Sequence, residues 1–281
     1  MHPALVRYDP TSSDGSAVGY NFDGTAGPGQ SVSYTWYADM GAVDTGTNLV
    51  DFGDRRGHRH HGLWGGLMIE PPLATWTDPK TGQPIDSGVQ ADIKVPGSRV
   101  NFREFVIDFA DGLNLRTKDG GLVPDAGAVD DPEDAGDRSV NYGEERFAPR
   151  IARDPQMANV FSSAVHGDPA TAVFEANRGD PTVLRVLDGS DRARAHTFML
   201  SGHDWPDQAW DSASMRRSTV GEMQPGTAFT LRLTGGAGGG GGAPGDYLFR
   251  DGGTVNQVSA GLWGLLRVTD PSASGVKPLG K

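Results

Sequence analysis

The sequence predicts an all-β protein built from two copies of one β-sandwich domain, and three observations support this prediction. First, Gly-Leu-Trp-Gly at Gly62–Gly65 returns as Gly261–Gly264, 199 residues later in the chain. Second, a Pro-Gly turn precedes each copy, at Pro28–Gly29 and at Pro225–Gly226, 197 residues apart. Third, 41 glycines and 19 prolines fall between short alternating runs, which is typical of strands and turns. A repeat at nearly constant spacing indicates two copies of one structural unit.

The expected strands alternate apolar and polar residues between turn residues. In order, they are Ala4–Tyr8, Ser31–Tyr37, Asn101–Phe109, Phe229–Leu233, Asp246–Phe249 and Leu262–Val268, with further strands within Val160–Leu187. The glycine run Gly235–Gly242 is expected to form a flexible hairpin tip, because it has almost no side chains to pack. Thr269–Lys281 is expected to be a loose tail.

The domain boundaries follow from the repeat and from a change in composition. We expect a first domain at residues 1–120, an acidic linker at 121–136, and a second domain at 137–281. The carboxylates around the linker lack the spacing of a calcium-binding EF-hand loop, which favours a solvated connector. About 45 residues of strand-like sequence precede His196 in the second copy, whereas the comparable point of the first copy lies near His2. The first domain is therefore expected to be N-terminally truncated.

Composition excludes several classes of function. A formal net charge of −11 argues against nucleic acid as a partner. No apolar run approaches the roughly 20 residues of a membrane span, and no signal peptide opens this chain. There is no cysteine, so disulfides, thiolate nucleophiles and iron–sulfur clusters are excluded.

Three histidines precede the first Gly-Leu-Trp-Gly corner. On an extended backbone His58 and His60 would project from the same face, as a pair that could bind Cu(II) or Zn(II), whereas His61 would face the other way. The neighbouring Arg55, Arg56 and Arg59 oppose a bound cation by their positive charge. The alternative is a polar loop that caps the sandwich and binds no metal.

The stretches HTFMLSGHDW (196–205) and GDYLFRDGG (245–253), together with both Gly-Leu-Trp-Gly corners, resemble the multicopper oxidases. The similarity is greatest to the C-terminal region of the large bacterial type that includes manganese oxidases. This resemblance implies cupredoxin-like Greek-key β-sandwiches, copper as the cofactor, oxidoreductase activity, and an extracytoplasmic or secreted location.

The copper ligands that the resemblance implies are mostly missing from this chain. His196 and His203 match the first and last histidines of the family's early copper motif, but Met199 and Ser201 stand where two copper-binding histidines belong. In the late motif, Gly252 stands at the cysteine position. The other late-motif histidine positions hold Asp251, Gly253 and Gln257. In the first copy His58 matches a late-motif histidine. A blue copper site needs a thiolate, and this chain has none. The candidate metal ligands are therefore His58, His60, His196 and His203.

Three functions remain open from the sequence. The first is a copper-poor cupredoxin pair that forms part of a larger oxidase. The second is an autonomous copper-binding protein that uses the His58 cluster. The third is a non-enzymatic secreted β-sandwich that binds partners or polymers. The expected partners are the remaining domains of an oxidase or further copies of this chain in a homo-oligomer.

Overall fold

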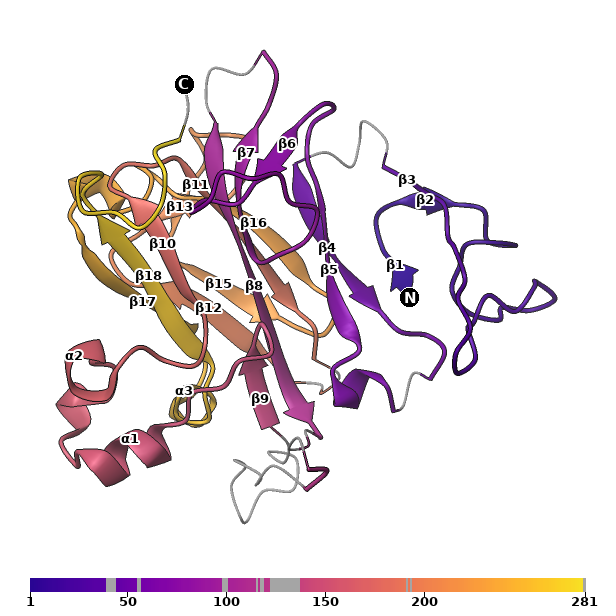
Figure 1. Ribbon diagram of the computed structural model, residues 1–281, viewed down its shortest axis with the longest axis horizontal. Coiled ribbons are helices and arrows are strands. Elements are labelled where there is room, and N and C mark those ends of the chain that lie inside the picture. The colour runs from indigo at the N-terminus through magenta and orange to yellow at the C-terminus, as the bar shows by residue number, and fades with distance from the viewer. Residues whose placement is uncertain are drawn as a thin grey trace.

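The computed structural model describes residues 1–38, 44–54, 57–97, 101–114, 116, 119–121, 137–190, 192 and 194–279. Strands dominate these residues, which confirms the all-β prediction (Figure 1). The first nine strands are β1 (His2–Pro3), β2 (Arg7–Tyr8), β3 (Trp36–Tyr37), β4 (Thr45–Val50), β5 (Trp64–Ile69), β6 (Thr75–Thr77), β7 (Gln90–Lys94), β8 (Phe102–Leu113) and β9 (Asp137–Val140). The next nine are β10 (Val173–Asn177), β11 (Thr182–Asp188), β12 (His196–Leu200), β13 (Trp205–Pro206), β14 (Arg216–Arg217), β15 (Thr219–Met223), β16 (Ala228–Arg232), β17 (Gly245–Asp251) and β18 (Trp263–Thr269).

The helices are short and lie between strands. They are α1 (Phe147–Arg153), α2 (Ser163–His166) and α3 (Val255–Ser259), with 3-10 turns η1 (Arg59–His61), η3 (Met157–Asn159) and η4 (Gly239–Gly241). No helix in the described ranges has the length and apolar character that crossing a bilayer requires.

Two facing sheets form the body of the protein. One has the strand order β10-β18-β17-β12-β15, and the other has the order β16-β11-β8-β7-β6 with β9 paired to β8. The inward side chains of both sheets make one apolar core that includes Phe105, Phe109, Phe198, Phe249 and Leu266. Burial of this aromatic and aliphatic surface is the main driving force that holds the sheets together.

Strand β8 belongs to this body, although the sequence places it in the first domain. It pairs in parallel with β11, with Phe105 opposite Leu184 and Phe109 opposite Asp188. Parallel pairing joins segments far apart in the chain, so the alternation within β8 could not reveal its partner. The described residues therefore share one core across the predicted boundary near residue 120. Most of the predicted linker at 121–136 lies outside the described residues.

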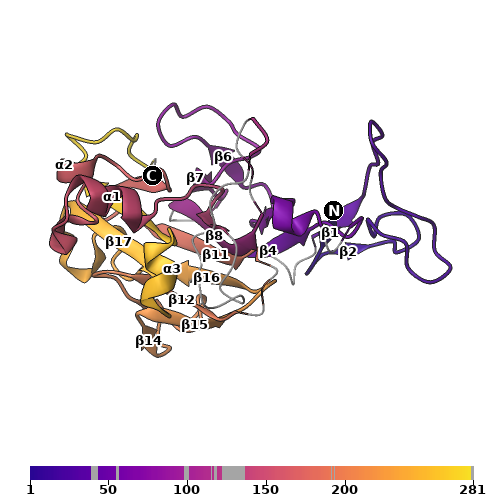
Figure 2. The same cartoon turned by 90° about the horizontal axis from the view of Figure 1, so that it is seen from below.

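A smaller sheet of β1, β4 and β5 lies against the side of the sandwich (Figure 2). The segment between β1 and β4 extends away from the body, and its described residues contain only the short strand pair β2–β3. The predicted strands Ala4–Tyr8 and Ser31–Tyr37 are thus limited to Arg7–Tyr8 and Trp36–Tyr37. Apolar side chains in this segment are exposed, including Tyr20 and Phe22, so no core extends these strands.

The two Gly-Leu-Trp-Gly corners share one local form, as the repeat predicts. A helical turn, η1 or α3, runs into Gly62 or Gly261, whose φ values are 90° and 119°. These left-handed values favour glycine. Trp64 and Trp263 then begin β5 and β18 with their side chains buried.

The glycine run Gly235–Gly242 is packed against the body, and its prediction as a flexible tip is wrong. Ala237 is fully buried, and its N–H donates to the carbonyl of Asp180. At Gly236, where φ is 74°, a Cβ would lie 2.4 Å from the Asp180 carbonyl oxygen. The absence of side chains therefore lets this backbone approach another backbone closely, which glycine alone permits.

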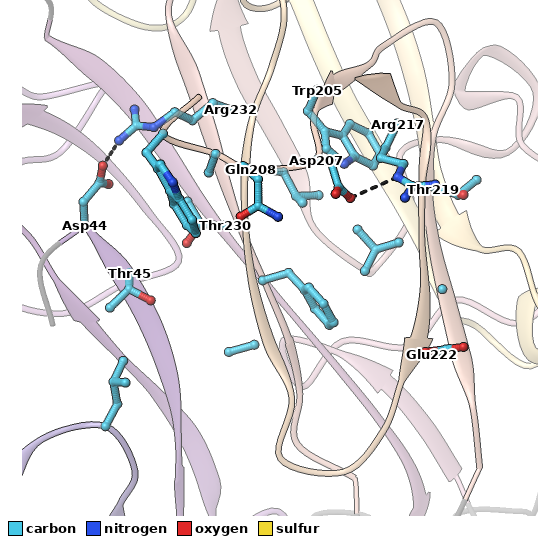
Figure 3. A pocket seen from close by; sticks show the side chains of 18 residues that line it. Asp44, Thr45, Trp205, Asp207, Gln208, Arg217, Thr219, Glu222, Thr230 and Arg232 are labelled. Carbon is cyan, nitrogen blue, oxygen red and sulfur yellow. Dashed lines mark hydrogen bonds and ion pairs between the residues drawn. The ribbon is translucent and has the colours of Figure 1, made fainter. Parts of the chain in front are cut away.

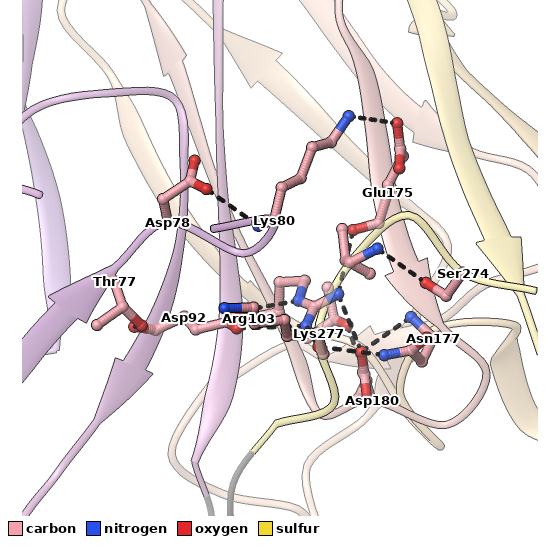
Figure 4. A network of polar contacts seen from close by, with 12 residues as sticks. Thr77, Asp78, Lys80, Asp92, Arg103, Glu175, Asn177, Asp180, Ser274 and Lys277 are labelled. Carbon is pink, nitrogen blue, oxygen red and sulfur yellow. Dashed lines mark hydrogen bonds and ion pairs between the residues drawn. The ribbon is translucent and has the colours of Figure 1, made fainter. Parts of the chain in front are cut away.

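The expected loose tail after β18 is also held in place, by the buried Arg103 (Figure 4). The Arg103 guanidinium pairs with Asp92 at 2.8 Å and Asp180 at 3.2 Å, and donates to the carbonyl of Lys277 at 2.7 Å. The Lys277 N–H donates to the Pro79 carbonyl. A buried guanidinium with several acceptors fixes the chain that supplies them, so the described part of the tail is ordered.

Candidate metal centre

The histidine segment before the first corner is a turn and not a strand. His58 has φ −63° and ψ −36°, and Arg59–His61 form the 3-10 turn η1. The expectation that His58 and His60 share one face of an extended backbone is therefore wrong. The His61 N–H donates to the His58 carbonyl, a local bond that alternation in the sequence does not show.

Each imidazole of this segment contacts a different partner. His58 Nδ1 lies 2.7 Å from Asp51 Oδ2, His60 Nδ1 lies 3.0 Å from the Gly112 carbonyl, and His61 Nδ1 lies 3.0 Å from the Asn114 carbonyl. The last two contacts fasten η1 to the end of β8. The three side chains thus hold the turn in place and do not converge on one point.

His196 lies on β12 in the interior of the sandwich, completely buried. Its Nδ1 is 2.5 Å from Asp251 Oδ2, and its Nε2 is 3.5 Å from Asp111 Oδ2. The second contact is long for a hydrogen bond and is an ion pair. Burial alone would lower the pKa of His196, but the close contacts with Asp111 and Asp251 and the negative charges of Asp111 and Asp188 outweigh it and raise the pKa to about 10. The ring is a cation at neutral pH.

Two further buried carboxylates, Asp188 and Asp108, interact with each other, and Asp188 also interacts with His196. Asp188 accepts a hydrogen bond from the Ser190 N–H at 2.9 Å, and Asp108 accepts one from the Gly189 N–H at 2.8 Å. Burial, and then the charge of Asp188, raises the pKa of Asp108 to about 8. Burial also raises the pKa of Asp188, although the positive charge of His196 opposes that effect. With a pKa of about 8, Asp108 is mainly protonated and neutral at pH 7.

His203 uses both ring nitrogens within the fold. Its Nδ1 lies 2.9 Å from the Ser201 carbonyl, and its Nε2 accepts the Gly238 N–H at 3.0 Å. Because Nε2 accepts, Nδ1 carries the proton and the ring is neutral. Burial lowers the pKa of His203, in agreement with that state. This histidine anchors the buried glycine run.

His196 and His203 do not fit copper. A metal ligand must be a deprotonated nitrogen, whereas His196 is a cation and both nitrogens of His203 are engaged. His60 and His196 approach adjacent residues of β8, Gly112 and Asp111, but they share no common point of coordination. Across the described ranges, no three histidine, aspartate or glutamate side chains are arranged to hold a metal ion.

Sequence reasoning missed the carboxylates that enclose His196. Asp111 lies in β8 between the apolar residues Phe109 and Leu113, and Asp251 ends β17. Charged residues in an apolar strand are a sign of buried pairing, because an isolated buried charge is strongly unfavourable. Their partner could not be identified, since His196 is distant in sequence from both strands.

Comparison with solved structures shows a shared fold. The multicopper oxidase mgLAC aligns with a TM-score of 0.52 at 15% identity, over 95% of this chain and 70% of that one. Another multicopper oxidase aligns with a TM-score of 0.46 at 15% identity, over 95% of this chain and 71% of that one. Copper nitrite reductase from Nitrosomonas europaea aligns with a TM-score of 0.47 at 13% identity, over 97% of this chain and 75% of that one. No protein-family model and no curated protein sequence matches. The first alignment shows that the chain has a multicopper-oxidase-like, cupredoxin-type β-sandwich fold.

Proposed function

We propose that this chain is a copper-poor cupredoxin unit that serves as a structural part of a larger oxidase and does not oxidise substrates by itself. The observation that supports the proposal is the buried Asp251–His196–Asp111 arrangement. His196 and Asp251 match positions where the resembled family places copper ligands. Here the imidazole is an imidazolium, which has no lone pair to offer a metal. An ion pair thus replaces metal coordination as the link between β12, β17 and β8.

Metal analysis of the purified chain tests this proposal. After equilibration with Cu(II) and dialysis, we expect no stoichiometric copper and no intense band near ~600 nm, because that band requires a copper–thiolate bond. We also expect no oxidation of phenols or Mn(II) with oxygen as acceptor. Stoichiometric copper whose electron paramagnetic resonance spectrum changes in His196→Gln would overturn the proposal.

The protonation state of His196 gives a second test that does not involve copper. Long-range ¹H–¹⁵N spectra should show both ring nitrogens protonated at pH 7, because the carboxylates raise the pKa to about 10. His203 provides the internal control, with one protonated nitrogen at the same pH. A neutral His196 ring at pH 7 would contradict the proposed ion pair.

One observation favours a second candidate function, copper binding at His58. Its Nδ1 contacts the carboxylate of Asp51 and the side chain is half-exposed. Metal-binding histidines commonly donate their other ring N–H to a carboxylate. Further ligands would have to come from another copy of the chain or from another oxidase domain. Loss of a Cu(II) spectrum in His58→Ala, with no change in His61→Ala, would support this alternative.

A further inference from the structure

A large slot lies between the edge strands of the two facing sheets (Figure 3). β15 is the last strand of one sheet and β16 is the first strand of the other. Both strands line the slot along their length. Its volume of about 1060 Å³ is at the upper end of the roughly 300–1,000 Å³ found for small-ligand pockets, which favours an extended ligand.

The floor of the slot is apolar. Val220, Leu231 and Trp205 line it and are buried beneath its surface, and Phe229 is half-buried beside them. Phe229 and Leu231 also belong to or pack against the main core. The slot therefore opens onto the end of the core, where apolar side chains of a ligand would be removed from water.

The backbone of β16 can accept another strand. The N–H of Leu233 donates to Thr182 and the N–H of Asp188 donates to Thr227, at opposite ends of the β11–β16 ladder. In an antiparallel ladder bonded residues alternate with residues whose N–H and C=O point outward. Val186 pairs with Phe229 in this ladder, so the N–H and C=O groups that point away from β11 are those of Ala228, Thr230 and Arg232. β11 is the partner of β16 among the described strands, so these groups form an open edge.

The opposite wall is also incomplete. β15 pairs with β12 at Thr219, Val220 and Met223, and the register shifts between them. Gly221 and Glu222 lie in the irregular stretch of this pairing. Among the described strands β12 is the partner of β15, so the other edge of β15 is unpaired. Unpaired strand edges are sites where another chain can add by backbone hydrogen bonds.

Charges around the slot indicate the ligand's charge. Asp207 pairs with Arg217 at 3.0 Å, and Asp44 pairs with Arg232, so these four side chains neutralise one another. The exposed carboxylate of Glu222 has no cationic partner within the described ranges, and Figure 3 shows it on the β15 wall. A cationic side chain on the ligand would complement it.

We propose that this slot binds an extended peptide that adds as a strand to β16. Alternate apolar side chains enter the floor, and a lysine or arginine faces Glu222. Strand addition of this kind takes affinity from main-chain hydrogen bonds and specificity from alternate side chains. This inference goes beyond the proposed structural role and does not depend on the copper content of the protein.

A defined peptide tests the inference. The probe is Thr-Val-Lys-Val-Thr-Val-amide with fluorescein on its N-terminal nitrogen, which leaves the lysine charged, and the protein is titrated into it up to about 1 mM. We expect binding with slowed hydrogen exchange at the N–H groups of Thr230 and Arg232. The same peptide with alternate N-methylated amides should not bind, because it cannot complete the ladder.

Protein variants locate the site. A Cβ at Gly221 meets nothing within 4 Å, so Gly221→Trp should fill the slot without disturbing the fold and weaken binding at least about tenfold. Gly240→Trp, at an equally open glycine outside the slot, is the matched control and should bind normally. Glu222→Lys should weaken binding by about threefold to fivefold, as expected for an exposed ion pair.

Three outcomes would overturn the inference. One is unchanged binding to Gly221→Trp, and another is equal binding of the N-methylated peptide. The third is that the peptide does not bind, whereas the β-glucan laminarin binds and Trp210→Ala abolishes that binding. Trp210 is 83% exposed beside the slot and would stack on a sugar ring. That result would assign the slot to polysaccharides. None of these measurements uses copper, so their results test the peptide inference independently of the proposed function.

Discussion

His196 shows how one residue at a metal-ligand position can have another role. Removal of this buried cation leaves Asp251 without its ion-pair partner in the interior, and leaves Asp111 with Arg194 at 3.7 Å. The charge of His196 therefore stabilises the folded state through these carboxylates. It also links three strands that come from distant parts of the sequence.

The stability that His196 contributes should depend on pH. Its folded pKa of about 10 lies above the ordinary value of 6.5, so the contribution is fully present below pH 6.5 and is lost as pH rises toward 10. At pH 7, His196→Gln should lower the free energy of unfolding by about 3–5 kcal/mol. Urea unfolding should show this difference shrinking steadily between pH 7 and 10. A constant difference would mean that the charge of His196 is unimportant.

Asp108 should have a pH dependence of different origin. Because burial raises its pKa to about 8, the folded state holds a proton that the unfolded state releases above its ordinary pKa of 3.8. Stability is therefore lost as pH rises from about 4 to 8. Asp108→Asn keeps an oxygen for the Gly189 N–H and removes this loss, so its stability relative to wild type should increase across that range. Exposed Asp86→Asn is the control, and a similar gain there would refute the assignment.

The glycine run between β16 and β17 shows how composition can mislead about an element. Glycines suggested flexibility, whereas in the structure they permit a backbone-to-backbone contact and a bond to His203. Glycine content does not distinguish these two cases, because both need a chain without side chains. The partner at Asp180 is distant in sequence.

Two glycine substitutions separate these cases. Gly236→Ala places a Cβ 2.4 Å from the Asp180 carbonyl oxygen at a φ of 74°, so it should lower the free energy of unfolding by more than about 2 kcal/mol. Gly240→Ala meets nothing within 4 Å and should change it by less than about 0.5 kcal/mol. Urea unfolding of both variants decides the matter. Equal effects would indicate that the run is not packed as described.

The two Trp corners were predictable from sequence, and the sheet that unites the chain was not. Each corner is a local unit of helical turn, glycine and buried tryptophan, so its form follows from neighbouring residues. The pairing of β8 with β11, in contrast, joins Phe105 to Leu184. The His58 pair was mispredicted for a similar reason, since a 3-10 turn and contacts to β8 override the strand geometry. The motif named His196 as a candidate metal ligand, whereas its charge state depends on carboxylates from β8 and β17 that the motif does not include.

The whole molecule is joined by a buried arginine between the small sheet and the sandwich. Arg185 of β11 donates to Glu104 at 2.7 Å, to Asp44 at 3.0 Å, and to Glu70, the residue after β5. Burial raises the pKa of Glu70 to about 8, although the charge of Arg185 opposes this rise. One guanidinium thus balances carboxylates from both parts of the structure.

Replacing this arginine should loosen the small sheet. Arg185→Met leaves Glu104 buried without a cation and Glu70 without a hydrogen-bond donor, so it should lower the free energy of unfolding by about 3–5 kcal/mol and accelerate hydrogen exchange in β4 and β5. Arg267→Met removes an arginine that also pairs with two carboxylates, Asp168 and Asp246, at the surface. Arg267→Met should lower the free energy of unfolding by at most about 1 kcal/mol. Similar costs for the two variants would contradict a joining role for Arg185.

The Arg103 site constrains the order in which the protein folds during synthesis on the ribosome. Its last acceptor, the carbonyl of Lys277, lies 174 residues after Arg103. During translation this hydrogen bond cannot form until Lys277 has emerged, although Asp92 and Asp180 are available earlier. Non-local pairings of this kind form slowly and leave partly assembled sheets exposed while they form. The Arg103 site should therefore be completed late, and the sheet edge around it should be exposed to aggregation until Lys277 has left the exit tunnel.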